Sequence, residues 1–197
     1  MKLYYSPGTC SLAPRIALIE AGLPFEGVAV DLRQRTVEDG RSLKEVNAKG
    51  YLPVLELDDG RRYTESVAVL DWIAARCPSL GVPGEDGRTR LIEMLAFLST
   101  EVHKQFTRVY FPTCDAERAL AVKKLGQRFQ WLASQLQGDY LFGAAFTTAD
   151  AYLYVMLTWA GNVGLDLPPA LTAFAERVAQ RPAVVQACSA EQPAQKA

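Results

Sequence analysis

Hydrophobic and polar residues in the first third of the chain alternate between strand and helix spacing. Residues 2–6, "KLYYS", form a short apolar and aromatic run that is typical of a strand. After a Pro-Gly turn, apolar residues recur at helical spacing from Leu12 to Ile19, and Gly22 is a typical residue to end that helix. Residues 25–32, "FEGVAVDL", then alternate as a second strand. This order predicts a β-α-β unit whose two strands run parallel.

Shorter elements follow this unit. Strand patterns at 54–57 and 61–64 flank an Asp-Gly pair, which is a strong signal for a hairpin. Residues 67–74 return to helical spacing, and Ser66 is the predicted N-cap of that helix. We therefore expect a small mixed sheet with helices packed against it, forming one α/β domain over residues 1–79.

Strand patterns are absent from the second half of the chain. Residues 78–90 are rich in Pro and Gly and are typical of a linker. Helical spacing then dominates four stretches, at 88–106, 116–136, 147–163 and 169–181. Thr147 and Asp150 have the spacing of a capping box with Asp in place of Glu. The sequence thus predicts an all-helical domain over residues 86–197, whose tail at 189–197 is expected to be frayed.

Composition and charge narrow the class of protein without identifying it. The chain has 197 residues, 49% hydrophobic and 22% charged, which is the balance of an ordinary globular protein. A net charge of −1 without any Lys/Arg-rich run argues against nucleic-acid binding. No apolar stretch is long enough for a membrane span, and "MKLYYSPG" has no apolar signal core. We therefore expect a cytoplasmic protein without a membrane partner.

The four cysteines, Cys10, Cys77, Cys114 and Cys188, are widely scattered and form no C-x-x-C pair. Neither a metal site nor a dithiol redox motif is therefore expected, and the thiols are expected to be free. Cys10 stands apart, because it follows a turn at the expected helix start near residues 10–11. There it is either a small buried hydrophobe or a thiolate favoured by the positive end of the helix.

Five motifs occur in a fixed order: "MKLYYSPGTCSLAPRIAL", "NAKGYLPVLELDDG", "TES", "STEVHKQF" and "FTTADAYL". In combination they resemble bacterial glutathione S-transferases, most closely the beta class, from residue 1 to about residue 190. The resemblance implies a thioredoxin-like N-terminal domain, an all-α C-terminal domain that forms the electrophile pocket, and a homodimer with the active site near the dimer cleft. It also implies a detoxification enzyme that conjugates the glutathione thiolate to small hydrophobic electrophiles, with glutathione as co-substrate and no further cofactor.

The resemblance implies two catalytic residues. Cys10 matches the cysteine that contacts the glutathione sulfur and can form a mixed disulfide with it. His103, the only histidine, matches a histidine that faces the active site. It would hydrogen-bond to the thiolate or electrophile, or assist proton transfer, since an unperturbed imidazole titrates near neutral pH. Tyr5 and Ser11 are lesser candidates, because other transferase classes activate the thiol with tyrosine or serine.

Six further residues are implied to bind glutathione: Arg35, Leu52, Pro53, Glu65, Ser66 and Glu101. Pro53 matches a cis-proline, and the backbone of the preceding Leu52 would pair with the cysteinyl part of glutathione. The Glu65 carboxylate suits the γ-glutamyl ammonium group, and Ser66 at a helix N-terminus suits the γ-glutamyl carboxylate. Arg35 would meet the glycine carboxylate.

One position departs from the family pattern. Ala96 stands where beta-class relatives often have an asparagine that reaches glutathione in the neighbouring subunit. Alanine lacks a hydrogen-bonding side chain, so Glu101 or Thr100 would have to take over that contact. The aromatic residues implied to line the electrophile pocket are Phe106, Tyr110 and Trp159.

Two other functions stay open on the sequence alone. One is a glutathione-dependent thiol–disulfide oxidoreductase in which Cys10 is the nucleophile and glutathione resolves the mixed disulfide. The other is a non-enzymatic carrier of apolar ligands that keeps the fold. The sequence identifies neither the electrophile nor whether Cys10 reacts covalently or only keeps the glutathione sulfur ionised.

Overall fold

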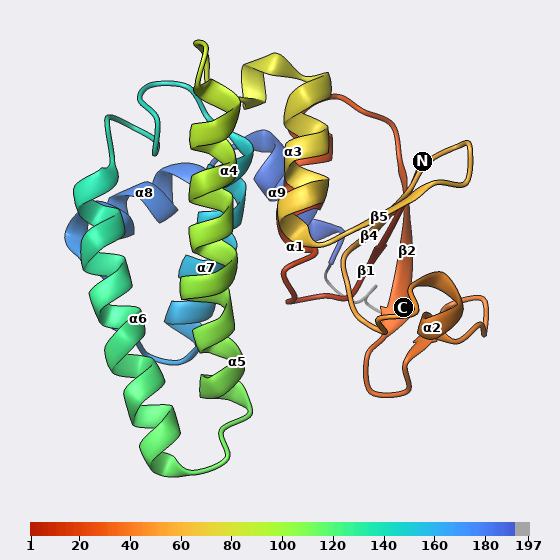
Figure 1. The fold of residues 1–197 in the computed structure, drawn as a ribbon, viewed down its shortest axis with the longest axis horizontal. Helices are drawn as coiled ribbons and strands as arrows, with labels where there is room; N and C mark the ends of the chain where they lie inside the picture. Colours follow the sequence, from red (N-terminus) through yellow and green to blue (C-terminus); the bar gives the residue numbers. More distant parts are fainter. Residues whose placement is uncertain (192–197) are drawn as a thin grey trace.

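The computed structural model describes residues 1–191 and consists of a sheet-containing half and a helical half (Figure 1). The first half contains β1 (Lys2–Tyr5), α1 (Leu12–Glu20), β2 (Glu26–Asp31), β3 (Thr36–Val37), α2 (Leu43–Val46), β4 (Val54–Glu56), β5 (Arg62–Thr64) and α3 (Ser66–Arg76). Its strands form one sheet in the order β3-β2-β1-β4-β5. This half has the thioredoxin-like fold that the resemblance implies.

Local signals explain most of the sheet. β1 and β2 pair in parallel, as the predicted β-α-β unit requires, and β4 and β5 form the predicted antiparallel hairpin. Gly22 follows α1 with φ 62°, and Gly60 lies in the hairpin turn with φ 83°. Glycine adopts this left-handed conformation at the lowest cost. β3 was not expected, because two residues are too few to show an alternating pattern.

Helices α1 and α3 lie between the sheet and the helical half (Figure 1). In the core that they form with the sheet, the side chains of Leu3, Ile16, Leu55 and Ile73 have no exposed surface. Burying one such side chain contributes roughly 1.5–3 kcal/mol. Cys10 belongs to the same core, so the loop between β1 and α1 is packed at its Cys10 end.

The helical half contains a 3-10 turn, η1 (Pro78–Leu80), α4 (Gly87–Phe97), a π-helical segment, η2 (Leu98–His103), α5 (Lys104–Tyr110), α6 (Asp115–Gln135), α7 (Thr148–Asn162), α8 (Pro169–Ala179) and α9 (Pro182–Ser189). α7 is buried on nearly every face, and α1 packs directly against it. The expected fold class, an α/β domain followed by an all-helical domain, is confirmed. Within residues 1–191, no helix is both long and apolar enough to cross a membrane.

The helical half differs in detail from the sequence prediction. α4 begins at Gly87, inside the expected linker, and the π-helical segment η2 interrupts the single helix expected at 88–106. α9 was not expected as a separate helix. The expected fraying from residue 189 onward is wrong for Glu191, whose side chain is only 8% exposed. The rest of that predicted tail, residues 192–197, lies outside the described residues.

The predicted capping box at the start of α7 is confirmed. The Asp150 carboxylate accepts hydrogen bonds from the Thr147 N–H at 2.8 Å and from the Thr147 hydroxyl at 2.6 Å. It also accepts the N–H of Leu141, at 2.8 Å. Burial raises the pKa of Asp150 to about 6, although these hydrogen bonds lower it. The carboxylate is therefore ionised at neutral pH and ties the loop before α7 to the helix.

Candidate active site

Two cavities meet at Cys10. The first, which we call the polar cavity, has a volume of about 270 Å³. Its lining residues are Cys10, Tyr51, Leu52, Glu65, Ser66, Ser99, His103, Lys104 and Tyr152. Loops and α3 of the first half and η2, α5 and α7 of the second half contribute to it, so it exists only where the two halves meet.

The second, which we call the apolar cavity, has a volume of about 550 Å³. Its lining residues are Gly8, Thr9, Cys10, Leu32, Tyr51, Leu52, His103, Thr107, Tyr110, Phe111 and Trp159. The two cavities share Cys10, Tyr51, Leu52 and His103. This pair of neighbouring cavities can hold a polar ligand on one side and an apolar ligand on the other, with the reacting atoms at the shared wall.

Cys10 lies in the turn before α1, whose first residue is Leu12. Its side chain is 7% exposed, and its Sγ makes a weak hydrogen bond to the Leu52 carbonyl oxygen at 3.8 Å. Burial raises the pKa of the Cys10 thiol to about 11, whereas a hydrogen bond with Ser66 lowers it. Desolvation therefore opposes, in the free protein, the thiolate that the helix N-terminus would favour at Cys10, and whether Cys10 ionises stays a prediction to be tested.

His103 is the last residue of the π-helical segment, and it lines both cavities. Its Nδ1 lies 2.8 Å from the Tyr152 hydroxyl. Burial lowers the pKa of His103 to about 4, and the charge of Lys104 acts in the same direction. The imidazole is thus neutral at neutral pH, and the near-neutral titration expected from the sequence is not retained.

The contact with Tyr152 is coupled to the tautomer of His103, because either group can donate the hydrogen bond. Burial raises the pKa of Tyr152, so its hydroxyl stays protonated. When that hydroxyl donates to Nδ1 of His103, the imidazole proton lies on Nε2. His103 then acts as a neutral hydrogen-bond donor rather than as a cation.

Glu65 and Ser66 bring the start of α3 to the polar cavity. Ser66 is the first residue of α3 and Glu65 is the N-cap, so the prediction of Ser66 as N-cap is wrong by one residue. Glu65 has φ 69°, a left-handed conformation that costs roughly 1–3 kcal/mol and occurs mainly at functional positions. Its carboxylate accepts hydrogen bonds from Lys49 Nζ at 2.7 Å and from the Tyr51 hydroxyl. These two groups hold the pKa of Glu65 below its usual value, so it is an anion.

Leu52 and Pro53 are joined by a cis peptide bond, as the resemblance implies. Pro53 directly precedes β4, and its own side chain is buried. Leu52 lines both cavities, and its carbonyl oxygen faces the Cys10 thiol. The backbone of Leu52 therefore lies beside the thiol at the junction of the two cavities.

Four residues predicted for the site line neither cavity: Arg35, Pro53, Glu101 and Phe106. The prediction that Phe106 lines the electrophile pocket is corrected. Phe106 has no exposed surface, and its ring packs against Phe129 of α6 with ring centroids 6.4 Å apart. The Glu101 carboxylate pairs with Arg128 of α6 at 2.6 Å. Arg35 is exposed in the loop before β3, also with a left-handed backbone, at φ 56°. The role of Glu101 in a neighbouring subunit's site stays a prediction.

The lesser candidates Tyr5 and Ser11 also line neither cavity. The ring of Tyr5 lies 3.9 Å from the guanidinium carbon of Arg15. Ser11 is fully buried, and its hydroxyl accepts a hydrogen bond from the Ser6 N–H at 3.2 Å. Ser11 therefore shapes the loop that carries Cys10 rather than facing a ligand.

Tyr110 and Trp159 both line the apolar cavity, as expected for two of the three predicted aromatic residues. Their rings meet edge to face with centroids 6.1 Å apart. The indole N–H of Trp159 donates to the Gly8 carbonyl oxygen at 3.1 Å. Phe111, 80% exposed, and Leu32, 41% exposed, add apolar surface at the rim.

The structure adds residues that sequence reasoning missed: Tyr51, Ser99, Lys104 and Tyr152 in the polar cavity, and Leu32, Thr107 and Phe111 in the apolar cavity. Tyr51 and Lys104 adjoin predicted residues in the sequence, and that adjacency was a usable signal. Tyr152 lies in "FTTADAYL", a motif to which only a folding role was assigned. Ser99 begins the motif "STEVHKQF", but an exposed and a cavity-facing serine look alike in a sequence.

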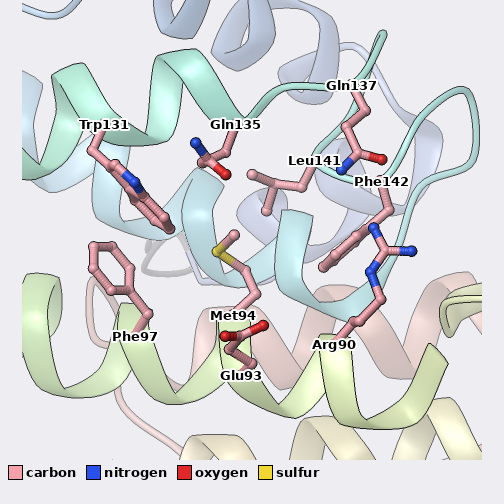
Figure 2. A pocket seen from close by; sticks show the side chains of 9 residues that line it. All are labelled: Arg90, Glu93, Met94, Phe97, Trp131, Gln135, Gln137, Leu141 and Phe142. Carbon is pink, nitrogen blue, oxygen red and sulfur yellow. The ribbon is translucent and has the colours of Figure 1, made fainter. Parts of the chain in front are cut away.

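A third cavity of about 350 Å³ lies apart from these two, between α4 and α6. Figure 2 shows Phe97 of α4 facing Trp131 of α6, with Met94 between the helices and Arg90 near Phe142. The Phe97 and Trp131 ring centroids are 4.3 Å apart. This cavity shares no lining residue with the polar or apolar cavity. Among residues 1–191, no cluster of three or more His, Cys, Asp and Glu side chains could hold a metal ion.

Comparisons with known proteins agree with this architecture. Residues 8–76 match the family model described as glutathione S-transferase, N-terminal domain, and residues 115–184 match that of the C-terminal domain. Glutathione S-transferase GstA of Escherichia coli O157:H7 is 40% identical over 198 residues, covering 97% of this chain and 98% of the relative.

Two solved structures extend the similarity to three dimensions. A sphingomonad glutathione S-transferase complexed with glutathione is 45% identical, with a TM-score of 0.90, covering 97% of this chain and 98% of that chain. A bacterial beta-class glutathione S-transferase of Sphingomonas chungbukensis is 42% identical, with a TM-score of 0.90 and the same coverage of 97% and 98%.

Proposed function

Because the chain belongs to the glutathione S-transferase family and is an enzyme that transfers glutathione, we propose that the glutathione sulfur binds where the polar and apolar cavities meet. The observation that carries this proposal is the wall that the two cavities share. It contains the two predicted catalytic residues, Cys10 and His103, together with the Leu52 backbone. Each of the two side chains carries a proton that it can donate to a sulfur anion.

The rest of glutathione, in this proposal, extends through the polar cavity. The γ-glutamyl ammonium group meets the Glu65 carboxylate, and the γ-glutamyl carboxylate meets Ser66 and the first N–H groups of α3. The cysteinyl part pairs with the backbone of Leu52 beside Pro53. Arg35 reaches the glycine carboxylate from outside the cavity, since its guanidinium lies near Gly50, next to the Tyr51 wall.

Catalysis in this arrangement is electrostatic. The Cys10 thiol keeps its proton because burial raises its pKa to about 11, so it is a hydrogen-bond donor rather than a second anion. The glutathione thiol releases its proton to water, and the Cys10 thiol together with Nε2–H of His103 stabilises the resulting thiolate. The thiolate attacks an electrophile held by Tyr110 and Trp159. A carbon–sulfur bond forms, and the electron pair moves to the leaving group or to an activated double bond.

The oxidoreductase alternative requires a thiolate at Cys10, which its burial disfavours. The assay that tests the transferase is conjugation of glutathione to chlorodinitrobenzene by the purified protein, and we expect a rate that saturates with glutathione. Absence of conjugation, together with failure to bind immobilised glutathione, would contradict the proposal. A role in detoxification and a cytoplasmic location stay predictions from the sequence.

Replacing Glu65 by Gln should raise the dissociation constant for glutathione by about tenfold or more. The change removes the anion that meets the ammonium group, and a hydrogen bond to a charged group is worth about 1.5–3 kcal/mol. Isothermal titration calorimetry measures the constant. The control is Asp59→Asn, another exposed carboxylate, which pairs with Arg61 in the hairpin and lines none of the three cavities. If Glu65→Gln and the wild type bind glutathione with equal affinity, Glu65 does not bind the γ-glutamyl ammonium group.

We also propose that the protein is a homodimer, and that the face around the α4–α6 cavity contributes to the contact. On this face, Trp131 lines the cavity and is 41% exposed (Figure 2 shows Trp131). Exposed aromatic side chains in such a patch favour association. Replacing Trp131 by Arg is expected to shift sedimentation toward the monomer, whereas Leu120→Arg, on the same helix outside this cavity, leaves the dimer intact. A monomeric wild type would refute the homodimer.

A further inference from the structure

Glu191, the second residue after α9, reaches back to the loop that carries Cys10. The Oε2 atom of Glu191 accepts a hydrogen bond from the backbone N–H of Gly8 at 3.0 Å, across 183 positions in the sequence. The Glu191 side chain is only 8% exposed. An acidic residue placed at the end of the last helix is thus buried against the first loop of the chain.

The Gly8 peptide is held on both sides. Its N–H donates to Glu191, and its carbonyl oxygen accepts the indole N–H of Trp159 at 3.1 Å. Gly8 itself lines the apolar cavity together with Thr9 and Cys10. Its φ of 72° lies in the left-handed region, so the turn has a conformation that the two hydrogen bonds keep in place.

Arg15 is the positively charged partner of Glu191. Its Nη1 lies 3.9 Å from Glu191 Oε1, and its side chain is 7% exposed. Within residues 1–191, these two atoms have no hydrogen-bond partner. Burial raises the pKa of Glu191, while the Gly8 N–H and Arg15 lower it. A buried charge pair with incomplete hydrogen bonding is a weak way to stabilise a fold, which favours a role in fixing the loop.

We propose that Glu191 is a positioning residue for the reaction: anchored near Arg15, it fixes the turn at Gly8 and thereby the Cys10 thiol and the adjoining wall of the apolar cavity. The kinetic effect that we expect of Glu191 rests on the proposed role of Cys10. The contact with Gly8 is independent of that role, so the two can be tested separately.

Two variants separate positioning from stability. Glu191→Ala removes the acceptor of the Gly8 N–H, whereas Glu191→Gln keeps an acceptor oxygen but loses the charge. Both leave Arg15 without its countercharge, so both lower the melting temperature. We expect amide hydrogen exchange at Gly8, followed by NMR, to accelerate about tenfold or more in the Ala variant only. The matched control is Glu176→Ala, an exposed glutamate of α8.

The catalytic efficiency should also distinguish the two variants of Glu191. With chlorodinitrobenzene, kcat/KM should fall about five- to tenfold in Glu191→Ala and return to near the wild-type value in Glu191→Gln. Equal losses in both variants, or unchanged Gly8 exchange in Glu191→Ala, would overturn the proposal. A wild type without conjugating activity would instead contradict the proposed function, and Gly8 exchange would still decide whether Glu191 holds the loop.

Discussion

Replacing Cys10 by Ala is expected to lower kcat/KM for glutathione conjugation by about 10- to 100-fold. The variant loses the thiol that donates a hydrogen bond to the glutathione thiolate, and hydrogen bonds to charged groups are worth about 1.5–3 kcal/mol. Cys10→Ser keeps a donor of similar size, so its kcat/KM should stay within about threefold of the wild type. Steady-state kinetics with chlorodinitrobenzene measure both values.

The pair of variants distinguishes hydrogen bonding from covalent chemistry at Cys10. If Cys10 forms an obligatory mixed disulfide, serine cannot replace it, and Cys10→Ser loses as much activity as Cys10→Ala. Such a result would favour the oxidoreductase alternative. Circular dichroism of both variants is the control for folding, since the Cys10 side chain is only 7% exposed and belongs to the core.

Replacing Asp150 by Ala should lower the free energy of unfolding by about 3–5 kcal/mol. The carboxylate satisfies the N–H groups of Leu141 and Thr147, both at 2.8 Å, and the Thr147 hydroxyl at 2.6 Å. Asp150 is completely buried, so its removal leaves these donors without partners, at about 1–3 kcal/mol for each unsatisfied group. Urea denaturation followed by circular dichroism measures the change.

The control for this prediction is Asp139→Ala. Asp139 lies 3.4 Å from Arg177 in an ion pair whose two side chains are 63% and 40% exposed. Exposed pairs contribute about 0–1 kcal/mol, so this variant should remain close to the wild type in stability. Comparable losses in the two variants would show that the capping box does not stabilise α7 in the way that its buried hydrogen bonds suggest.

Elements of the fold with strong local signals were predicted from the sequence. The β-α-β unit, the Asp-Gly hairpin and the capping box of α7 each depend on residues within a few positions of one another. The π-helical segment η2 was not predicted, because six residues cannot distinguish π from α spacing by their hydrophobic pattern. β3 was not predicted either, because its two residues are too few to show an alternating pattern.

The site was only partly predictable, because its lining depends on how the two halves pack. Phe106 and Tyr110 lie four positions apart on α5, yet Phe106 is fully buried in the core and Tyr110 lines the apolar cavity. The sequence placed Cys10 near a helix N-terminus correctly. The raised pKa of its thiol follows from burial in the assembled core, which no local pattern reports. Tyr152 joins His103 from a helix 49 positions further along the chain.

The protonation state of Cys10 in the free protein decides whether its side chain is a neutral hydrogen-bond donor or a thiolate. Ultraviolet thiolate absorbance of the wild type and of Cys10→Ser, with and without glutathione, isolates the Cys10 contribution from that of the other three cysteines. We predict no Cys10-dependent thiolate in the free protein at neutral pH, because burial raises the Cys10 pKa to about 11. Glutathione should add the absorbance of one bound thiolate. A Cys10-dependent thiolate at neutral pH in the free protein would contradict the account.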